Sequence, residues 1–453
     1  MNNISQDPWY FPPSNGGEES GLSDGMMDIF PGIDNLGRES AQNCIGANNE
    51  PDKPVLVKYQ LKYLDSDLFP GKENYLKRLE SASNYYSTQD EWTGDEYGRL
   101  QRAIEVLKKP KIPVLVISDF HTTGLFGSES EKGAPYFKFL KSSGISTRTP
   151  MSPGTYGYGK NALVKFSALR AISVYSKHIE HDLNGDIQSN DLYVGRSVLC
   201  THKDPETNQE TQKVGYYALK DESNYWSAFR GGKINEIKVP IAREQFGTDI
   251  YVWGYEDQDA LNGWDIKLAM GLFYAFFQAI REEKIKFEIY HEDDLVYEIN
   301  SDNLVEFSGK LETDCIKNLG TDDWEASSCD LVSGYLKCTE SSNSSSQTTE
   351  IINIKNIGDI ILKIYSNKED LGLRNNFCIM RKPLMTIESH EYNPSGKPYQ
   401  AVCMVINDRG NNLLADMENG SHTELHMKYV RNKQNKRMSL MALRELKREI
   451  KKR

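Results

Sequence analysis

The order of the predicted elements indicates an α+β protein that begins with an α/β sandwich, a mixed sheet covered on one face by helices. Two helical patterns precede an apolar strand, a loop and a further helix, and a run of strands follows them. This order is typical of layered domains. The chain has 453 residues, more than the roughly 250–300 at which single cores stop growing, so we expect two domains.

The composition of the chain limits which classes of protein it can belong to. Hydrophobic residues make up 38% and charged residues 26% of the chain, and the net charge of -11 argues against a nucleic-acid-binding surface over the whole molecule, although a local basic patch is compatible with it. The seven cysteines form no C-x-x-C pair, which favours reduced thiols in a cytoplasmic protein. The most apolar stretch, 264–280, contains Asp265 and Lys267, so we expect no membrane span.

The first predicted elements come after a polar stretch. Residues 1–53 are rich in Asn, Ser, Gly and Asp without periodicity, and we expect a disordered or loosely attached leader. Alternation over 55–61 predicts a strand that could pair at an edge or reach a partner subunit. Apolar spacing predicts helices over 71–86 and 97–108, the second stopped by Pro110.

The central predicted strand, 113–118, is apolar, and Asp119 follows it at the start of a loop. A helix over 162–169 follows. The strands predicted after it share alternating or continuously apolar patterns, and they cover 171–175, 192–201, 214–219 and 246–253.

The second half is predicted to carry another α/β domain. An amphipathic helix over 264–283 leads to strands at 285–290, 295–299, 351–365 and 401–406. Lys and Arg dominate 427–453, which has a helical composition. We therefore predict a leader (1–53), a first domain (54–258), a second domain (259–426) and a basic helical tail (427–453).

One predicted helix carries a pair of residues suited to hydrolysis. Glu80-x-x-x-Asn84 places a carboxylate and an amide one turn apart on one helix face. A carboxylate can deprotonate water, and an amide oxygen can bind Mg²⁺. Without further context, a solvated surface pair is the better explanation of this spacing.

Three later features suit a nucleotide. Asp119 at a strand end can accept a hydrogen bond from the adenine amine, Gly124 allows a close approach of the chain, and Thr248 can add a hydroxyl. A glycine loop before a helix can place N–H groups on phosphate. The loop residues that we expect to bind nucleotide are Gly154, Thr155, Tyr156, Gly157, Tyr158, Gly159, Lys160 and Asn161.

Taken together and in this order, these motifs resemble those of the GHKL ATPases, which include gyrase, the ninety-kilodalton heat-shock chaperone, histidine kinases and MutL. The resemblance covers roughly residues 72–253 and implies the GHKL (Bergerat) sandwich, with ATP and Mg²⁺ as cofactors. It implies that Glu80 is the general base, Asn84 the metal ligand, Asp119 the adenine-binding residue and the glycine loop a lid over phosphate. The family pattern is Asp-x-Gly-x-Gly, and here the first glycine is absent.

The glycine loop also allows another interpretation. Gly154-x-x-x-x-Gly159-Lys160 spells a P-loop, except that Asn161 replaces the Ser or Thr that holds Mg²⁺. The stretch before it, 147–153, is polar and contains proline, whereas a P-loop follows an apolar strand. Elsewhere, His422-Thr-Glu-Leu-His426 places two histidines one turn apart, and we expect a surface helix there rather than a zinc site.

The second half resembles, by position and order, the transducer domain of gyrase, MutL and MORC. In those proteins a transducer lysine reaches the γ-phosphate, and Lys382 is the candidate here. The resemblance to MutL/MORC-like ATPases of bacterial restriction and phage defence implies a nucleotide-dependent homodimer, a nuclease or helicase partner and DNA contact through the basic tail. A chaperone-like ATPase acting on a protein client and a nucleotide sensor without turnover remain alternatives.

Overall fold

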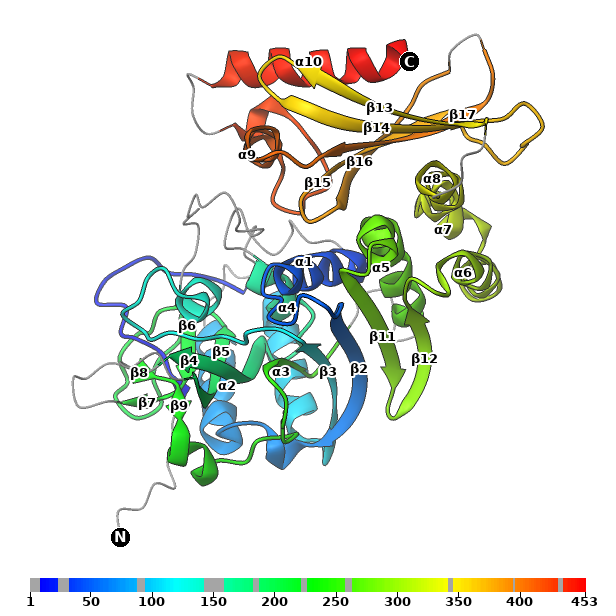
Figure 1. Cartoon of the computed structure of the whole chain (residues 1–453). Coiled ribbons are helices and arrows are strands. Elements are labelled where there is room, and N and C mark those ends of the chain that lie inside the picture. The colour runs from blue at the N-terminus through cyan, green and yellow to red at the C-terminus, as the bar shows by residue number, and fades with distance from the viewer. Residues whose placement is uncertain are drawn as a thin grey trace.

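Two β-sheets with helices packed against them make up the computed structural model (Figure 1), which confirms the α+β class. The structure describes residues 9–22, 32–87, 94–141, 159–181, 187–220, 226–256, 263–340, 345–393, 396–430 and 435–453.

The large sheet is mixed and runs in the order β1-β6-β5-β4-β10-β3-β2-β11-β12, with β9 beside β5. Its described strands are β1 (Trp9–Tyr10), β2 (Val55–Asp65), β3 (Lys111–Phe120), β4 (Ala171–His181), β5 (Ile187–Val198), β6 (Val214–Tyr217), β9 (Phe229–Arg230), β10 (Gly247–Trp253), β11 (Ile285–His291) and β12 (Asp294–Ile299). A short ribbon pairs β7 (Leu219–Lys220) with β8 (Trp226–Ser227). The strands and helices predicted along 55–299 are confirmed, with bounds that differ by a few residues.

Helices cover both faces of this sheet, so the prediction of one covered face was wrong. On β3, Leu115 and Ile117 pack with α1 (Ile33–Ile45), α4 (Gly159–Lys165) and α5 (Trp264–Arg281). Val114 and Val116 point the other way and pack with α2 (Lys72–Ser87) and α3 (Gly94–Lys108). Alternate side chains of a strand project to opposite faces. The nearly continuous apolar run of β3 is therefore explained by burial on both sides.

The described part of the predicted leader is structured, which corrects that prediction. The indole of Trp9 is completely buried and its Nε1 donates to the carbonyl oxygen of Pro70 at 2.7 Å, while β1 pairs with β6. Helix α1 packs against α5 and β2. The strand β2 is not an edge strand either, because β3 and β11 pair with its two sides.

The second sheet runs β13-β14-β17-β15-β16. Its strands are β13 (Gln347–Ile354), β14 (Gly358–Ser366), β15 (Asn376–Arg381), β16 (Met385–Glu391) and β17 (Tyr399–Val405), and α9 (Asp408–Met417) and α10 (Lys436–Lys452) pack with it. Helices α6 (Leu304–Asn318), α7 (Thr321–Ala326) and α8 (Val332–Thr339) connect the sheets. The strands predicted in 351–365 and 401–406 and the helical C-terminal segment are confirmed.

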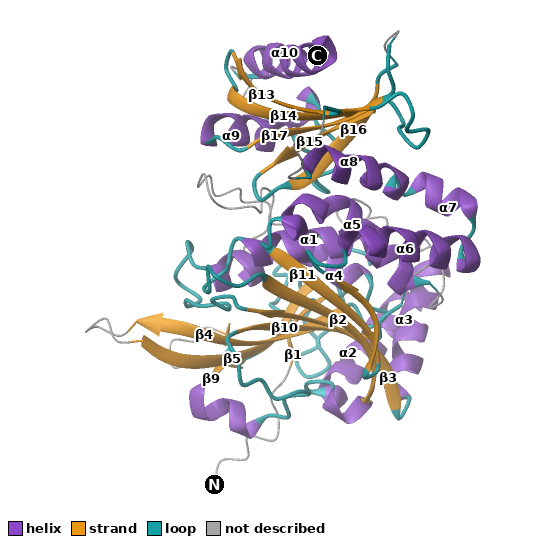
Figure 2. Cartoon of the chain, turned by 45° about the vertical axis from the view of Figure 1, so that its right-hand side comes forward, coloured by secondary structure: helices purple, strands orange, loops and turns teal. Residues whose placement is uncertain are grey.

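The two sheets share one core, and α5 lies between them (Figure 2). Phe276 and Phe277 of α5 belong to the same cluster of buried side chains as Met380 and Met385 of the second sheet. The strands β11 and β12 pair in the large sheet. The predicted boundary after residue 258 therefore differs from the sheet organisation, in which the first sheet extends to Ile299. In the described residues no helix is long and apolar enough to cross a membrane.

Candidate functional site

Asp119 lies at the end of β3, on the face of the sheet that α1 covers. The alternation of β3 places it on the same side as Leu115 and Ile117. Its Oδ1 accepts hydrogen bonds from the backbone N–H of Thr248, at 3.2 Å, and from the hydroxyl of Thr122. Burial raises the pKa of Asp119, and the nearby charge of Arg243 opposes that rise. The predicted proximity of Asp119 and Thr248 is present in the structure, through the Thr248 backbone rather than its hydroxyl.

The Thr248 hydroxyl instead contacts Ser176 of β4. The two oxygens lie 3.1 Å apart, and Ser176 Oγ accepts from the N–H of Leu125 at 2.8 Å. Gly124 has φ +68°, and a Cβ built there would lie 2.5 Å from the carbonyl oxygen of Lys177. The chain after Asp119 is thus pressed against β4, and only glycine fits this approach. Gly124 has a structural role here that does not require a bound ligand.

His121 has an unusual backbone conformation in the loop after Asp119. It stands two residues after Asp119, where the Asp-x-Gly-x-Gly pattern has glycine, and its φ is +63°. Non-glycine residues rarely adopt this conformation. Its Nδ1 lies 2.7 Å from the carbonyl oxygen of Pro54, which fixes the ring. The loop therefore has a left-handed backbone at a residue that carries a side chain.

The C-terminal end of α1 is attached to this loop. The N–H of Thr123 donates to the carbonyl oxygen of Ala47 at 2.9 Å, and Asn48 pairs with Thr122 in an isolated β-bridge. The Cys44 thiol donates to the carbonyl oxygen of Ser40 at 3.1 Å, and burial followed by the charge of Asp119 raises the pKa of Cys44. Helix α1 is therefore the helix that borders Asp119.

Helix α1 carries a Glu-x-x-x-Asn pair of its own, Glu39 and Asn43, which the sequence interpretation missed. The Asn43 amide nitrogen donates to the Glu39 carbonyl oxygen at 2.9 Å and lies 3.5 Å from Glu39 Oε1. Burial raises the pKa of Glu39, whose side chain is 12% exposed. The signal was present in the sequence, because the spacing is the one already recognised at Glu80 and Asn84, but the segment was assigned to the leader.

Glu80 and Asn84 do not join Asp119. They lie on α2, whose apolar side packs against the opposite face of the sheet. Glu80 is 45% exposed and its Oε1 accepts from Lys108 of α3 at 3.0 Å, and Asn84 is exposed. The prediction that these two residues share a site with Asp119 is therefore wrong, because the intervening sheet separates them.

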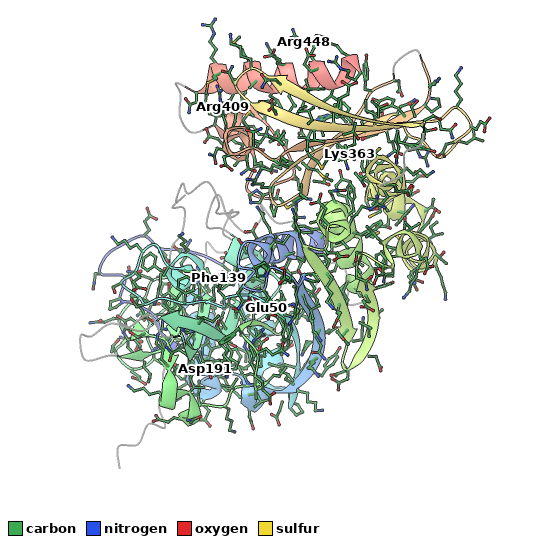
Figure 3. The ribbon with its side chains drawn as sticks, viewed as in Figure 1. Glu50, Phe139, Asp191, Lys363, Arg409 and Arg448 are labelled. Carbon is green, nitrogen blue, oxygen red and sulfur yellow. The ribbon has the colours of Figure 1, made fainter. Side chains whose placement is uncertain are left out.

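Most of the predicted glycine loop, Gly154 to Tyr158, lies outside the described residues. Gly159, Lys160 and Asn161 form the first turn of α4, and their side chains also lie outside the description. Helix α4 packs against α1. The last described segment before the loop is the π-helical turn Phe137–Lys141. This turn contains Phe139, which is labelled in Figure 3. Residues 142–153 lie outside the described part of the chain, and the P-loop interpretation stays a prediction.

Lys382 lies at the turn between β15 and β16. Its Nζ donates to Asp408 Oδ1 at 2.9 Å, and both side chains are exposed. The structure thus gives Lys382 an acidic partner in the second sheet, and the predicted contact with phosphate stays a prediction.

Oxygen donors for a cation are few near α1. No group of three or more His, Cys, Asp or Glu side chains in the described part of the chain is arranged to hold a metal ion. The hydrogen bond of Asn43 uses its amide nitrogen and not its oxygen, and oxygen is the atom type that Mg²⁺ prefers. This donor set fits a Mg²⁺ ion that takes most of its ligands from phosphate and water.

No protein-family model and no curated protein matches the chain. Among solved structures, the ATPase domain of MutL from Aquifex aeolicus, complexed with ADP, is similar to it with 9% identity and a TM-score of 0.24, over 64% of this chain and 80% of that chain. These values are too low to carry a conclusion about activity, so the function must be inferred from the residues themselves.

Proposed function

We propose that the chain binds and hydrolyses ATP with a GHKL-type site on the α1 face of the large sheet. The observation that carries the proposal is the arrangement of α1. Its Glu39-x-x-x-Asn43 pair lies on the helix whose end is fastened to the loop after Asp119, and α4, which follows the glycine loop, packs against it. In the proposed site Glu39 and Asn43 thus replace Glu80 and Asn84, on the helix that borders Asp119.

Each residue then has a chemical role. Asp119 accepts a hydrogen bond from the adenine amine, and Thr248 holds that carboxylate through its N–H. Glu39 orients and deprotonates the attacking water, because its buried carboxylate is a stronger base than an exposed one. Asn43 supplies an oxygen to Mg²⁺, which neutralises charge on the phosphates. The glycine loop 154–159 closes over the phosphates as a lid.

The test compares two glutamates with the same change. E39Q should lower kcat for ATP hydrolysis by about 100-fold or more, the loss typical of a removed general base, while ATP still binds. E80Q, on the opposite face, should leave kcat unchanged. Turnover is measured by phosphate release and affinity by equilibrium binding. Normal turnover by E39Q, or loss in E80Q, would contradict the proposed site.

We further propose that ATP binding closes a homodimer and that the protein works with a nuclease or helicase partner in bacterial DNA restriction or phage defence. Lid closure beside α1 would change the surface offered to a second copy. The dimer is tested by size measurement with and without a non-hydrolysable ATP analogue. A monomer under both conditions would contradict dimer closure.

DNA contact is proposed for a basic stripe on α10, which the spacing of exposed residues supports. Arg437, Arg444, Arg448 and Lys451 are exposed and share one side of the helix, with Arg448 labelled in Figure 3. Deleting the helix is a poor test, because Leu446 and Ile450 are buried against the second sheet. The double variant R444E/R448E should abolish stimulation of the ATPase by DNA, whereas K286E on β11 should not. Stimulation by unfolded protein instead of DNA would favour the chaperone-like alternative.

A further inference from the structure

A buried row of charged side chains connects the second sheet to Glu39. It consists of Arg381 at the end of β15, Glu418 and His422 in the segment after α9, and Glu39 on α1. Their side chains are 3%, 0%, 2% and 12% exposed, respectively. His422 was expected on a surface helix, but it lies in a turn and is buried. Buried charges in proteins are normally paired, and here the pairing crosses from one sheet's layer to the other.

Arg381 and Glu418, the first two residues of this row, fix the orientation of the His422 ring. Arg381 donates from Nε and NH2 to the two oxygens of Glu418, the second bond measuring 2.7 Å. Burial would raise the pKa of Glu418, but the Arg381 charge holds it at about 2. Ionised Glu418 can only accept, so His422 Nδ1 donates to Glu418 Oε2 across 2.5 Å.

The second ring nitrogen then faces Glu39. His422 Nε2 lies 3.8 Å from Glu39 Oε2. The backbone of His422 is left-handed, with φ +56°, and its N–H donates to the carbonyl oxygen of Asn419 at 3.2 Å. Such backbone strain persists only where the surroundings enforce it. Both the backbone of His422 and its bond to Glu418 thus direct the imidazole toward the carboxylate of Glu39.

We propose that His422 is a positioning residue for Glu39, so that ATP hydrolysis requires the second domain to be docked on α1. The inference rests on the proposed function, in which Glu39 is the general base. A base must lie within hydrogen-bond reach of the attacking water, and a misplacement of about 1 Å can lower the rate by about 100-fold. Asn43 on the same helix lies 3.5 Å from Glu39 Oε1, and His422 lies 3.8 Å from Glu39 Oε2, so a neighbour at each oxygen limits where the carboxylate can lie.

The decisive variant is His422→Asn. An asparagine amide can occupy the place of Nδ1 and keep the bond to Glu418, and asparagine tolerates a positive φ, but it has no atom in place of Nε2. H422N should therefore fold with unchanged thermal stability and unchanged ATP affinity, while kcat falls by about 10- to 100-fold. H422Q, whose amide can reach the place of Nε2, should recover part of this loss.

Two comparisons separate positioning from a structural role. H390A removes another second-sheet histidine, which pairs with Glu388 at 2.7 Å and not with Glu39, and should leave kcat unchanged. In a background of E39Q, H422N should cause no further loss, because its effect operates through the carboxylate. A loss that multiplies with that of E39Q, or a wild-type kcat in H422N, would overturn the inference. Wild-type protein that neither binds nor hydrolyses ATP would instead overturn the proposed function.

Discussion

The backbone N–H of Thr248 donates to Oδ1 of Asp119 across 3.2 Å, which ties the start of β10 to the end of β3. The Thr122 hydroxyl donates to the same oxygen from the loop. Two neighbouring segments therefore hold the carboxylate in place before any ligand arrives. A carboxylate keeps acceptor capacity beyond two bonds, so this arrangement suits recognition of an N–H donor such as the adenine amine.

Replacing Asp119 with asparagine tests that recognition. D119N keeps an oxygen for Thr248 and Thr122 but loses the charge, and a hydrogen bond to a charged group contributes roughly 1.5–3 kcal/mol. We expect ATP to bind about 10- to 150-fold more weakly, with thermal stability maintained. D191N is a matched control, because Asp191 lies on β5 and accepts from Tyr175. Equal ATP affinity of D119N and wild type would argue against adenine binding at Asp119.

Substitution by alanine at Gly124 and at Gly98 should change the free energy of unfolding in opposite directions. At Gly124 the positive φ and the close carbonyl oxygen of Lys177 both oppose a Cβ, so we expect G124A to lower the free energy of unfolding by about 1–3 kcal/mol. Gly98 lies in α3 with nothing within 4 Å of an added Cβ, and G98A should stabilise by roughly 0.5–1 kcal/mol. Denaturant unfolding measures both changes. A harmless G124A would show that the loop does not press on β4.

Glu418 should make stability depend on pH under acidic conditions. Its pKa of about 2 lies below the ordinary 4.5, so its stabilising contribution is present above pH 4.5 and is lost as the pH falls toward 2. The shift corresponds to about 3 kcal/mol. E418Q should cost about 3–5 kcal/mol at pH 7, because Arg381 stays buried without its counter-charge, and its stability should fall less steeply between pH 4.5 and 2. E350Q, at an exposed pair with Arg453, should change little.

Trp9 tests whether the N-terminal segment is part of the fold. W9A removes a completely buried indole that contacts Phe69 and Tyr75, and we expect a loss of about 3–5 kcal/mol. Y63A, at a side chain that is 45% exposed, should stay within about 0.5 kcal/mol of wild type. Chemical denaturation gives both values. If W9A matched Y63A in stability, the segment before α1 would not be an integral part of the sheet.

The elements with clear periodicity were predictable from sequence, and α1 was not, for a physical reason. Helix α2 buries an ordinary apolar stripe, including Tyr75 and Leu79. Helix α1 instead buries Arg38, Ser40 and Gln42 among its residues, and Ser40 Oγ lies 2.8 Å from the hydroxyl of Tyr59. Buried polar residues such as these leave no apolar pattern in the sequence.

The candidate site was predicted in part. The meeting of Asp119 with the start of β10 follows from motifs on adjacent strands, and it is present. The sequence pattern of α2 shows that one side is buried but not which face of the sheet buries it. Glu80 and Asn84 were therefore predicted beside Asp119, although α2 lies on the opposite face. The proposed role of His422 depends on its contact with Glu39, and these two residues lie far apart along the chain. Local sequence patterns do not predict such a contact.

The position of α5 between the sheets affects how the protein melts. Because Phe276 and Phe277 share a cluster with side chains of both sheets, neither sheet can lose its packing without uncovering the other. Calorimetry should record one transition rather than two. For the same reason, a recombinant fragment that ends after β12 would expose an apolar flank of α5 to solvent and would tend to aggregate, so binding assays are best made on the intact chain.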